Sequence, residues 1–292
     1  MKYITFVCLY TFLLTFAFAQ SDASLESMDQ DSRIISVGGH ITETVFALGA
    51  GANVVGTDLS SIYPAEVREL PQVGYHRTIS AEGVLSLNPS FFIGSSVTGP
   101  PEAVEQLRRT KIDMLIVEDD YSIDGARNKI RLLADKLNRK AEGDSLVAIL
   151  DEDLKKVEML KKKVKKKPRV LFLLSHSPTS LLVAGRGTRA AKMIELAEGE
   201  SVGNDFNGFK PLNPESLVAK APDVIIMLSM GINSVGGIES LLERPGINLT
   251  PAAKNKRVEV FDDQYFTSFG PRLGKALYDV MLALHPYLKD AE

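Results

Sequence analysis

The sequence predicts an α/β protein with two lobes, a single long helix that joins them, and a cleft where the lobes meet. Short apolar runs alternate with helical patterns in residues 33–138 and again in residues 170–287. Such alternation is typical of a parallel sheet covered by helices. Residues 141–167 interrupt it with one continuous helical pattern. The expected boundaries are therefore 33–140 for the first lobe, 141–167 for the connecting helix and 168–292 for the second lobe.

The first lobe is predicted from four apolar runs bounded by turn residues and from the helical patterns between them. The expected strands are residues 33–37, 53–56, 91–94 and 112–117. The expected helices are residues 41–48, 80–87, 101–109 and 122–138. Ser80 suits a helix cap, and Pro101 suits a first helical turn because its missing N–H would be unpaired there.

The connecting helix and the second lobe are predicted in the same way. Five apolar residues of the connection recur at helical spacing, namely Leu150, Leu154, Val157, Leu160 and Val164. Pro168 ends this pattern. The expected strands beyond it are residues 170–174, 224–228 and 258–261, and the expected helices are residues 188–197, 238–242 and 273–287. Ligands of open α/β sheets bind beyond the carboxyl ends of the strands, and a rigid helical connection favours closure by a small tilt.

The first residues predict export to the periplasm. Lys2 precedes seventeen uncharged residues that end in a small-x-small pattern at Ala19, which is typical of a secretory signal peptide over residues 1–19. Residues 20–32 are polar and are expected to form a flexible leader. The one cysteine, Cys8, lies in the signal, so a mature protein without disulfides or thiolate metal sites is expected. The formal net charge of −3 excludes a general nucleic-acid binder.

One glycine motif resembles a nucleotide-binding fingerprint. Gly185, Gly187 and Ala190 match the pattern G-x-G-x-x-A at the start of an expected helix. No strand that ends in Asp or Glu follows about twenty residues later, where the ribose partner belongs. An anion site at the helix N-terminus is therefore favoured over a dinucleotide site.

The histidines and serines give weak indications of chemistry. No pair of the four histidines has a zinc-binding spacing, and these histidines are His40, His76, His176 and His285. His176 is kept as a candidate because residues 175–187 are expected to line the cleft from the second lobe. The G-x-S-x-G pattern occurs at residues 199–203, but nothing in the sequence places its serine in a catalytic triad, so an exported hydrolase stays unsupported.

The segment 70–80 is the most informative one for binding. Gly74 allows the chain to turn and present Tyr75, and Arg77 lies two residues on, on the same side of an extended chain. A tyrosine binds iron as the phenolate, which a ferric ion and a nearby guanidinium both favour. The alternative is that Tyr75 packs on the cleft wall and Arg77 pairs with a surface carboxylate.

Four segments resemble the haem-binding periplasmic proteins of bacterial haem ABC importers, within a wider group that carries cobalamin and siderophores. They are residues 33–64, 70–90, 183–199 and 241–273, and the resemblance as a whole runs from about residue 33 to 286. The family fold consists of two Rossmann-like lobes joined by a long helix. The VGYHR and FGPR segments are similar to those of the haem subgroup.

This resemblance implies roles for individual residues. Tyr75 would be the axial ligand of ferric haem, and Arg77 would support its phenolate. His176 would be a second iron ligand from the other lobe. Arg272 would pair with a haem propionate or cap a neighbouring loop, and residues 230–237 would face the cleft beside it.

The resemblance also implies a membrane partner. Relatives dock on the permease of the ABC transporter, in the inner membrane, through one acidic residue on each lobe. The matching positions are Glu102 and Glu215, both at expected helix starts, where a negative charge is also favourable to the helix itself.

The sequence is thus interpreted as a monomeric, periplasmic, non-enzymatic carrier that captures haem between its lobes. The alternatives are a siderophore or cobalamin carrier of the same fold, and an exported enzyme.

Overall fold

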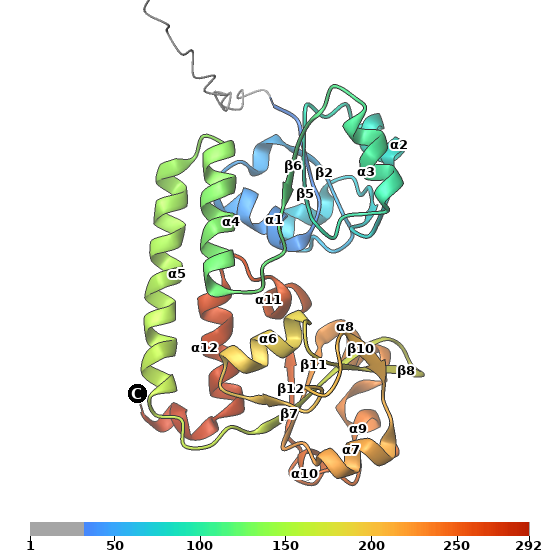
Figure 1. Cartoon of the computed structure of the whole chain (residues 1–292), viewed down its shortest axis with the longest axis vertical. Coiled ribbons are helices and arrows are strands. Elements are labelled where there is room, and N and C mark those ends of the chain that lie inside the picture. Colours follow the sequence, from blue (N-terminus) through green and yellow to red (C-terminus); the bar gives the residue numbers. More distant parts are fainter. Residues whose placement is uncertain (1–31, 292) are drawn as a thin grey trace, which may run out of the picture.

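The computed structural model describes residues 32–291, with the side chains of residues 176, 290 and 291 left out. The expected signal peptide 1–19 and leader residues 20–31 lie outside the described residues. Two α/β lobes lie one above the other, and helices run along one side of both (Figure 1). The two-lobe α/β prediction is confirmed.

The first lobe is built on a parallel sheet of four strands in the order β2-β1-β5-β6. The strands are β1 (Ile34–Ser36), β2 (Val54–Thr57), β5 (Phe91–Ser95) and β6 (Asp113–Val117). One face packs on α1 (Gly39–Ala47) and α4 (Ile123–Lys136), and the other on α2 (Ala81–Ser86) and α3 (Pro101–Arg108). Because both faces are covered, the strands are apolar throughout, which explains why they were recognisable in the sequence.

The second lobe has the sheet order β10-β8-β7-β11-β12, with β9 beside β7. Its strands are β7 (Arg169–Ser177), β8 (Ser180–Ala184), β9 (Glu200–Ser201), β10 (Phe209–Pro211), β11 (Val224–Leu228) and β12 (Val258–Phe261). Strands β7, β11 and β12 run parallel to one another. Strand β8 is antiparallel to both of its neighbours, β7 and β10. The expected loop 175–187 is therefore wrong, because residues up to 177 extend β7 and residues 180–184 return beside it as β8.

Helices cover both faces of this second sheet. One face packs on α6 (Arg189–Leu196) and α12 (Leu273–Leu284). The other face packs on short helices, which are α7 (Pro214–Lys220), α8 (Ser229–Ser234), α9 (Gly237–Leu242) and α10 (Pro251–Lys254). The small helix α11 (Asp263–Thr267) precedes α12 and lies between the lobes (Figure 1).

The connecting helix α5 runs from Lys140 to Lys161 and packs against α4 of the first lobe and α12 of the second. Close approach at both contacts requires glycine. A Cβ on Gly143 would lie 2.4 Å from the Ala134 side chain, and one on Gly274 would lie 2.7 Å from that of Asp153. The helix ends six residues before the expected limit, since the lysines that follow carry like charges and precede Pro168.

A buried ion pair joins the lobes in addition to α5. The carboxylate of Glu43, on α1, accepts hydrogen bonds from Arg272 Nε and Nη2 at 2.7 and 2.9 Å. The same carboxylate accepts hydrogen bonds from Gln264 at 3.0 Å and Ser268 at 3.3 Å. Glu43 is 2% exposed, and the Arg272 guanidinium stacks on the Tyr63 ring at 3.6 Å. We call these residues the cross-lobe clamp.

Two further contacts tie the lobes together. Gln264 Oε1 accepts the N–H groups of Ile62 and Tyr63 at 2.9 and 3.1 Å, and its Nε2 donates to the Gly39 carbonyl at 2.9 Å. Lys129, which is buried on α4, donates to the Phe269 carbonyl at 3.1 Å. Burial lowers the pKa of Lys129 to about 8.

None of the helices within residues 32–291 has the length and apolar character needed to span a bilayer.

Replacing Arg272 with Ala is expected to lower the free energy of unfolding by about 3 kcal/mol, because it leaves the buried Glu43 carboxylate without its cation. Arg109→Ala is the matched control. Its pair with Glu105 is exposed on both sides and should contribute less than about 1 kcal/mol. Urea denaturation followed by circular dichroism measures both losses, and equal losses in the two variants would contradict a special role for the clamp.

Candidate functional site

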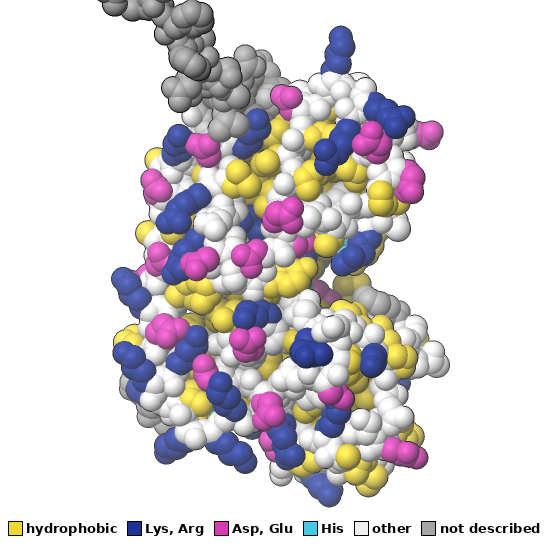
Figure 2. Space-filling view, in the orientation of Figure 1, with side chains coloured by type: hydrophobic (Ala, Val, Ile, Leu, Met, Phe, Trp, Pro, Cys, Tyr) yellow, Lys and Arg dark blue, Asp and Glu magenta, His cyan; other side chains and the backbone are white. Residues whose placement is uncertain are grey.

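A notch separates the lobes on the side away from α5 (Figure 2). The carboxyl ends of the first lobe's strands lead toward the second lobe. Gly39, just after β1, and Asp119, just after β6, both contact residues of the second lobe. The notch is thus where ligands of open α/β sheets are expected, and it is the candidate site.

A small hairpin carries the tyrosine that the sequence singled out. Strands β3 (Gly74–Tyr75) and β4 (Thr78–Ile79) are antiparallel, and His76 and Arg77 form the two-residue turn between them. The expected extended loop is therefore wrong, since Tyr75 ends a strand and Arg77 lies in the tight turn that follows it. Gly74 has φ +110°, and a Cβ there would lie 2.8 Å from the Thr78 carbonyl, so this strand begins with glycine because no other residue fits.

Backbone hydrogen bonds fix the hairpin to the first lobe. The Leu59 N–H donates to the Gly74 carbonyl at 2.9 Å, which ties the hairpin to the chain that follows β2. The Gly99 N–H donates to the His76 carbonyl at 2.9 Å, and the Ile79 N–H donates to the Gly99 carbonyl at 2.8 Å. The hairpin is therefore held by the segments that follow β2 and β5, at the carboxyl ends of the sheet.

Tyr75 and Arg77 are both open to a ligand. Tyr75 is 42% exposed, and its hydroxyl has no hydrogen-bond partner among the described residues. Arg77 is exposed, and no carboxylate within residues 32–291 forms an ion pair with it. The alternative in which Arg77 pairs with a surface carboxylate is thus absent from the described part of the chain.

Apolar side chains lie at strand ends in both lobes. Leu59, after β2, is 54% exposed, and Met230, after β11, is 66% exposed. Met230 lies in the first turn of α8, on the side of the second lobe that faces the first (Figure 1). Its N–H donates to Asp263 at 3.1 Å. The expected loop 230–237 is therefore largely helical, and it lies where the sequence placed it, at the carboxyl end of a second-lobe strand.

A buried polar group lies where the two lobes meet. His40 Nε2 lies 3.1 Å from Asp119 Oδ1, and Arg189 Nη2 reaches across from α6 to within 3.1 Å of Asp119 Oδ2. The Arg189 guanidinium also lies 5.0 Å from the centre of the Tyr121 ring. Burial, with the nearby charge of Lys129, lowers the pKa of His40 to about 3, so His40 is neutral at neutral pH.

This arrangement explains the glycine motif 185–190. Gly187, with φ +75°, leads into α6, and Thr188 caps the helix by accepting the Ala191 N–H at 3.1 Å. The motif thereby places Arg189, the first residue of α6, within ion-pair distance of the Asp119 carboxylate. The anion that the Arg189 side chain binds here is thus a carboxylate of the other lobe.

The remaining sequence candidates are placed as follows. Arg272 does not face an open ligand site, because Glu43 occupies two of its nitrogens. The backbone of His176 lies in β7, and its side chain is outside what the structure describes. Glu102 and Glu215 are exposed in the first turns of α3 and α7, one on each lobe. Both helices lie on the side of the molecule away from α5 (Figure 1).

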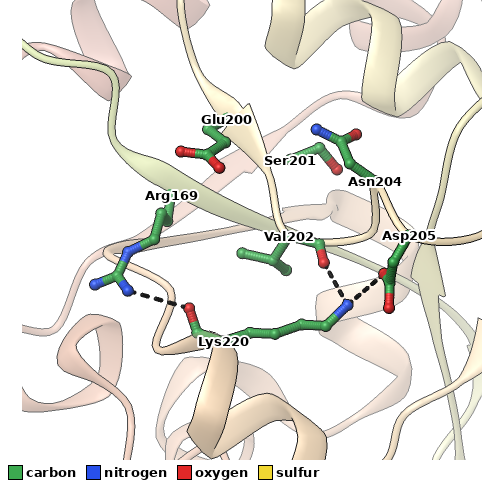
Figure 3. A pocket seen from close by; sticks show the side chains of 7 residues that line it. All are labelled: Arg169, Glu200, Ser201, Val202, Asn204, Asp205 and Lys220. Atoms are coloured by element: carbon green, nitrogen blue, oxygen red, sulfur yellow. Dashed lines mark hydrogen bonds and ion pairs between the residues drawn. The ribbon is translucent and has the colours of Figure 1, made fainter.

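The pockets found elsewhere are open and are lined largely by polar and charged residues. A cavity of about 390 Å³ lies on the second lobe, where Lys220 donates to the Val202 carbonyl at 2.6 Å and pairs with Asp205 (Figure 3). The charges of Lys220 and Asp205 therefore satisfy each other. Within residues 32–291, no three His, Cys, Asp or Glu side chains are grouped as a metal site.

Comparison with known proteins defines the family. The model of the periplasmic binding protein family matches residues 34–265. The chain belongs to this family. Its members described below are named as binding proteins, which agrees with a carrier rather than an enzyme.

Three relatives show what this family member is similar to. The periplasmic heme-binding protein RhuT from Roseiflexus sp. RS-1, in its apo form, is 40% identical, with a TM-score of 0.84 over 88% of this chain and 98% of RhuT. BhuT, a periplasmic heme-binding protein solved with two hemes, is 36% identical, with a TM-score of 0.83 over 88% and 99% of the chains. The ABC transporter substrate-binding lipoprotein YvrC of Bacillus subtilis, itself uncharacterized, is 26% identical over 88% of this chain and 81% of its own.

Stability is expected to fall as the pH drops below about 6.5, partly because of His40. The folded pKa of His40 is about 3 and the ordinary value is 6.5, so between these values the unfolded chain binds a proton that the folded chain does not. This difference removes up to about 1.4 kcal/mol of stability per pH unit. Urea unfolding of His40→Gln from pH 7.5 to 4.5 should give a shallower fall. A curve parallel to the wild type would contradict the assignment.

Proposed function

We propose that this protein is an exported carrier that binds haem in the notch between its lobes and delivers it to the permease of an ABC importer. The observation that carries the proposal is Tyr75, an exposed tyrosine on a hairpin at the carboxyl end of the sheet, whose hydroxyl has no hydrogen-bond partner among the described residues. Relatives named as heme-binding proteins, at 40% and 36% identity, support it. The protein performs no chemistry on its ligand.

Haem presents an iron, two carboxylates and a large apolar face, and the proposal assigns a residue of this chain to each. Tyr75 binds ferric iron as the phenolate, and Arg77 favours the charged form by its own positive charge. Leu59 and Met230 offer apolar contact to the ring. His176 is the proposed second ligand to the iron.

The propionates require a basic group that is not already engaged. Arg77 meets this condition among the residues of the hairpin, since no protein carboxylate within the described residues pairs with it. Arg272 could bind a propionate only by releasing Glu43, which would leave a buried carboxylate unpaired. Arg77 is therefore the proposed partner for a propionate as well as for the phenolate.

Export and docking complete the proposal. The signal peptide expected over residues 1–19 would place the protein in the periplasm. Glu102 and Glu215 are the proposed contacts with basic groups of the permease, since they are exposed, lie on separate lobes and are carried by helices on the same side of the molecule.

A titration of the purified protein with haemin tests the ligand. Haem bound through tyrosinate should give a Soret band with ferric charge-transfer features, at a stoichiometry read from the break in the titration curve. Parallel titrations with cyanocobalamin and with a ferric siderophore test the other ligand classes of this fold. No spectral change with haemin, together with binding of either of these, would overturn the haem proposal.

Tyr75→Phe is expected to abolish the tyrosinate spectrum and to weaken haemin binding by about tenfold or more, as the loss of one strong polar contact would. The substitution keeps the ring and deletes only the oxygen, so it separates iron ligation from packing. Absorption spectra and a haemin titration measure both effects. A tyrosinate spectrum that persists in Tyr75→Phe would show that another tyrosine holds the iron.

Reversing both Glu102 and Glu215 to Lys is expected to abolish haem uptake in cells while haemin binding stays unchanged. The matched control reverses Glu158 and Glu195, which are exposed on α5 and α6. It makes the same change in net charge on other parts of the surface. Growth on haem as the iron source measures uptake, and equal growth of the two double variants would contradict the docking assignment.

A further inference from the structure

His76 is only partly exposed although it lies in a hairpin turn. Its neighbours Tyr75 and Arg77 are exposed, whereas the His76 side chain is 13% exposed. Its ring folds back against the Tyr75 ring, with the ring centres 4.1 Å apart and the planes tilted by 51°. Within residues 32–291, this is the one aromatic ring contact that Tyr75 makes.

The far side of the imidazole lies against a rigid part of the lobe. His76 Nδ1 lies 3.8 Å from Asp58 Oδ2, and Asp58 is fully buried at the carboxyl end of β2. The Asp58 carboxylate accepts hydrogen bonds from Gly38 N–H at 2.7 Å, Ser60 N–H at 2.9 Å, Ser61 Oγ at 2.7 Å and Ser60 Oγ. Asp58 is therefore held in place by the chain that follows both β1 and β2.

His76 thus lies between a hydrogen-bonded carboxylate and a tyrosine whose hydroxyl has no hydrogen-bond partner within residues 32–291. The backbone of Tyr75 is fixed by the hairpin, but its side-chain rotamer depends on what the ring packs against. A free phenol at this exposure would lose rotamer entropy when it bound iron, and a ring already held in place would not.

We infer that His76 is a positioning residue that holds the Tyr75 ring in the orientation needed to bind ferric haem, with Asp58 as its support. This inference rests on the proposed function. The inferred role is packing of the His76 ring against the Tyr75 ring, and it includes no bond between His76 and the iron. It predicts that haem leaves faster when the imidazole is removed, because the iron–oxygen bond then forms on a mobile ring.

The test compares haemin dissociation from His76→Ala and His76→Phe with the wild type, using a haem-scavenging globin to trap what is released. His76→Ala should keep the tyrosinate spectrum and release haemin about twofold to tenfold faster, the range that an aromatic pair of this kind provides. His76→Phe restores a ring against Tyr75 and should bring the rate back toward the wild type.

Thr78→Ala is the matched control, since Thr78 pairs with Tyr75 across the hairpin. An equal rate increase in Thr78→Ala would show that loosening the hairpin suffices, and would overturn the inference. So would an unchanged rate in His76→Ala, or a His76→Phe variant that is folded, as judged by its melting temperature, but as fast as His76→Ala.

The double variant Tyr75→Phe, His76→Ala separates this inference from the proposed function. If His76 acts through Tyr75, His76→Ala should add nothing once the phenol oxygen is gone. A further loss in the double variant would assign His76 a separate role and overturn the inference. If Tyr75→Phe keeps the tyrosinate spectrum, the iron ligand of the proposed function fails first, and the inference fails with it.

Discussion

The relation between the two lobes depends on the carboxylate of Glu43. It belongs to the first lobe, it is buried, and the side chains that satisfy it come from the second lobe, on Gln264, Ser268 and Arg272. A buried carboxylate separated from these partners would be strongly unfavourable, so the lobes cannot part here without a large penalty. The separation of the two lobes across the notch follows from this contact.

The other cross-lobe contacts reinforce the same geometry. Lys129 binds the Phe269 carbonyl, Arg189 binds Asp119, and α5 packs closely on one helix of each lobe. These contacts lie at different points of the boundary, so a tilt that relieved one would strain another. The sequence alone favoured closure by a small tilt, because a single helix was its only visible connection. The polar contacts oppose even that movement, and they favour a cleft that is formed before the ligand arrives.

The sequence predicted those parts of the fold that repeat a local pattern. Buried parallel strands and long amphipathic helices were found within a few residues, because their apolar spacing is visible along the chain. Strand β8 was missed because it is defined by pairing with β7, and the hairpin 74–79 was missed because two-residue strands have no periodicity. Tyr75 was singled out from the residues of its loop, and its role as an iron ligand, which came from the resemblance, stays a prediction. The partner of Arg272 was not predicted from the sequence, because Glu43 lies 229 positions away and no local pattern links the two residues. A glutamate among the apolar residues of helix 41–48 was the one available sign.

The fixed arrangement of the lobes has a consequence for recognition by the transporter. A carrier that closes around its ligand changes the distance between its lobes, and a transporter can distinguish the loaded carrier by that distance. Here the distance between α3 and α7 would be the same in the empty and the loaded protein. On the proposed docking, empty carriers would occupy the transporter as readily as full ones. The transporter would then have to sense the cargo directly, or tolerate a share of unproductive encounters that grows as the supply of haem falls.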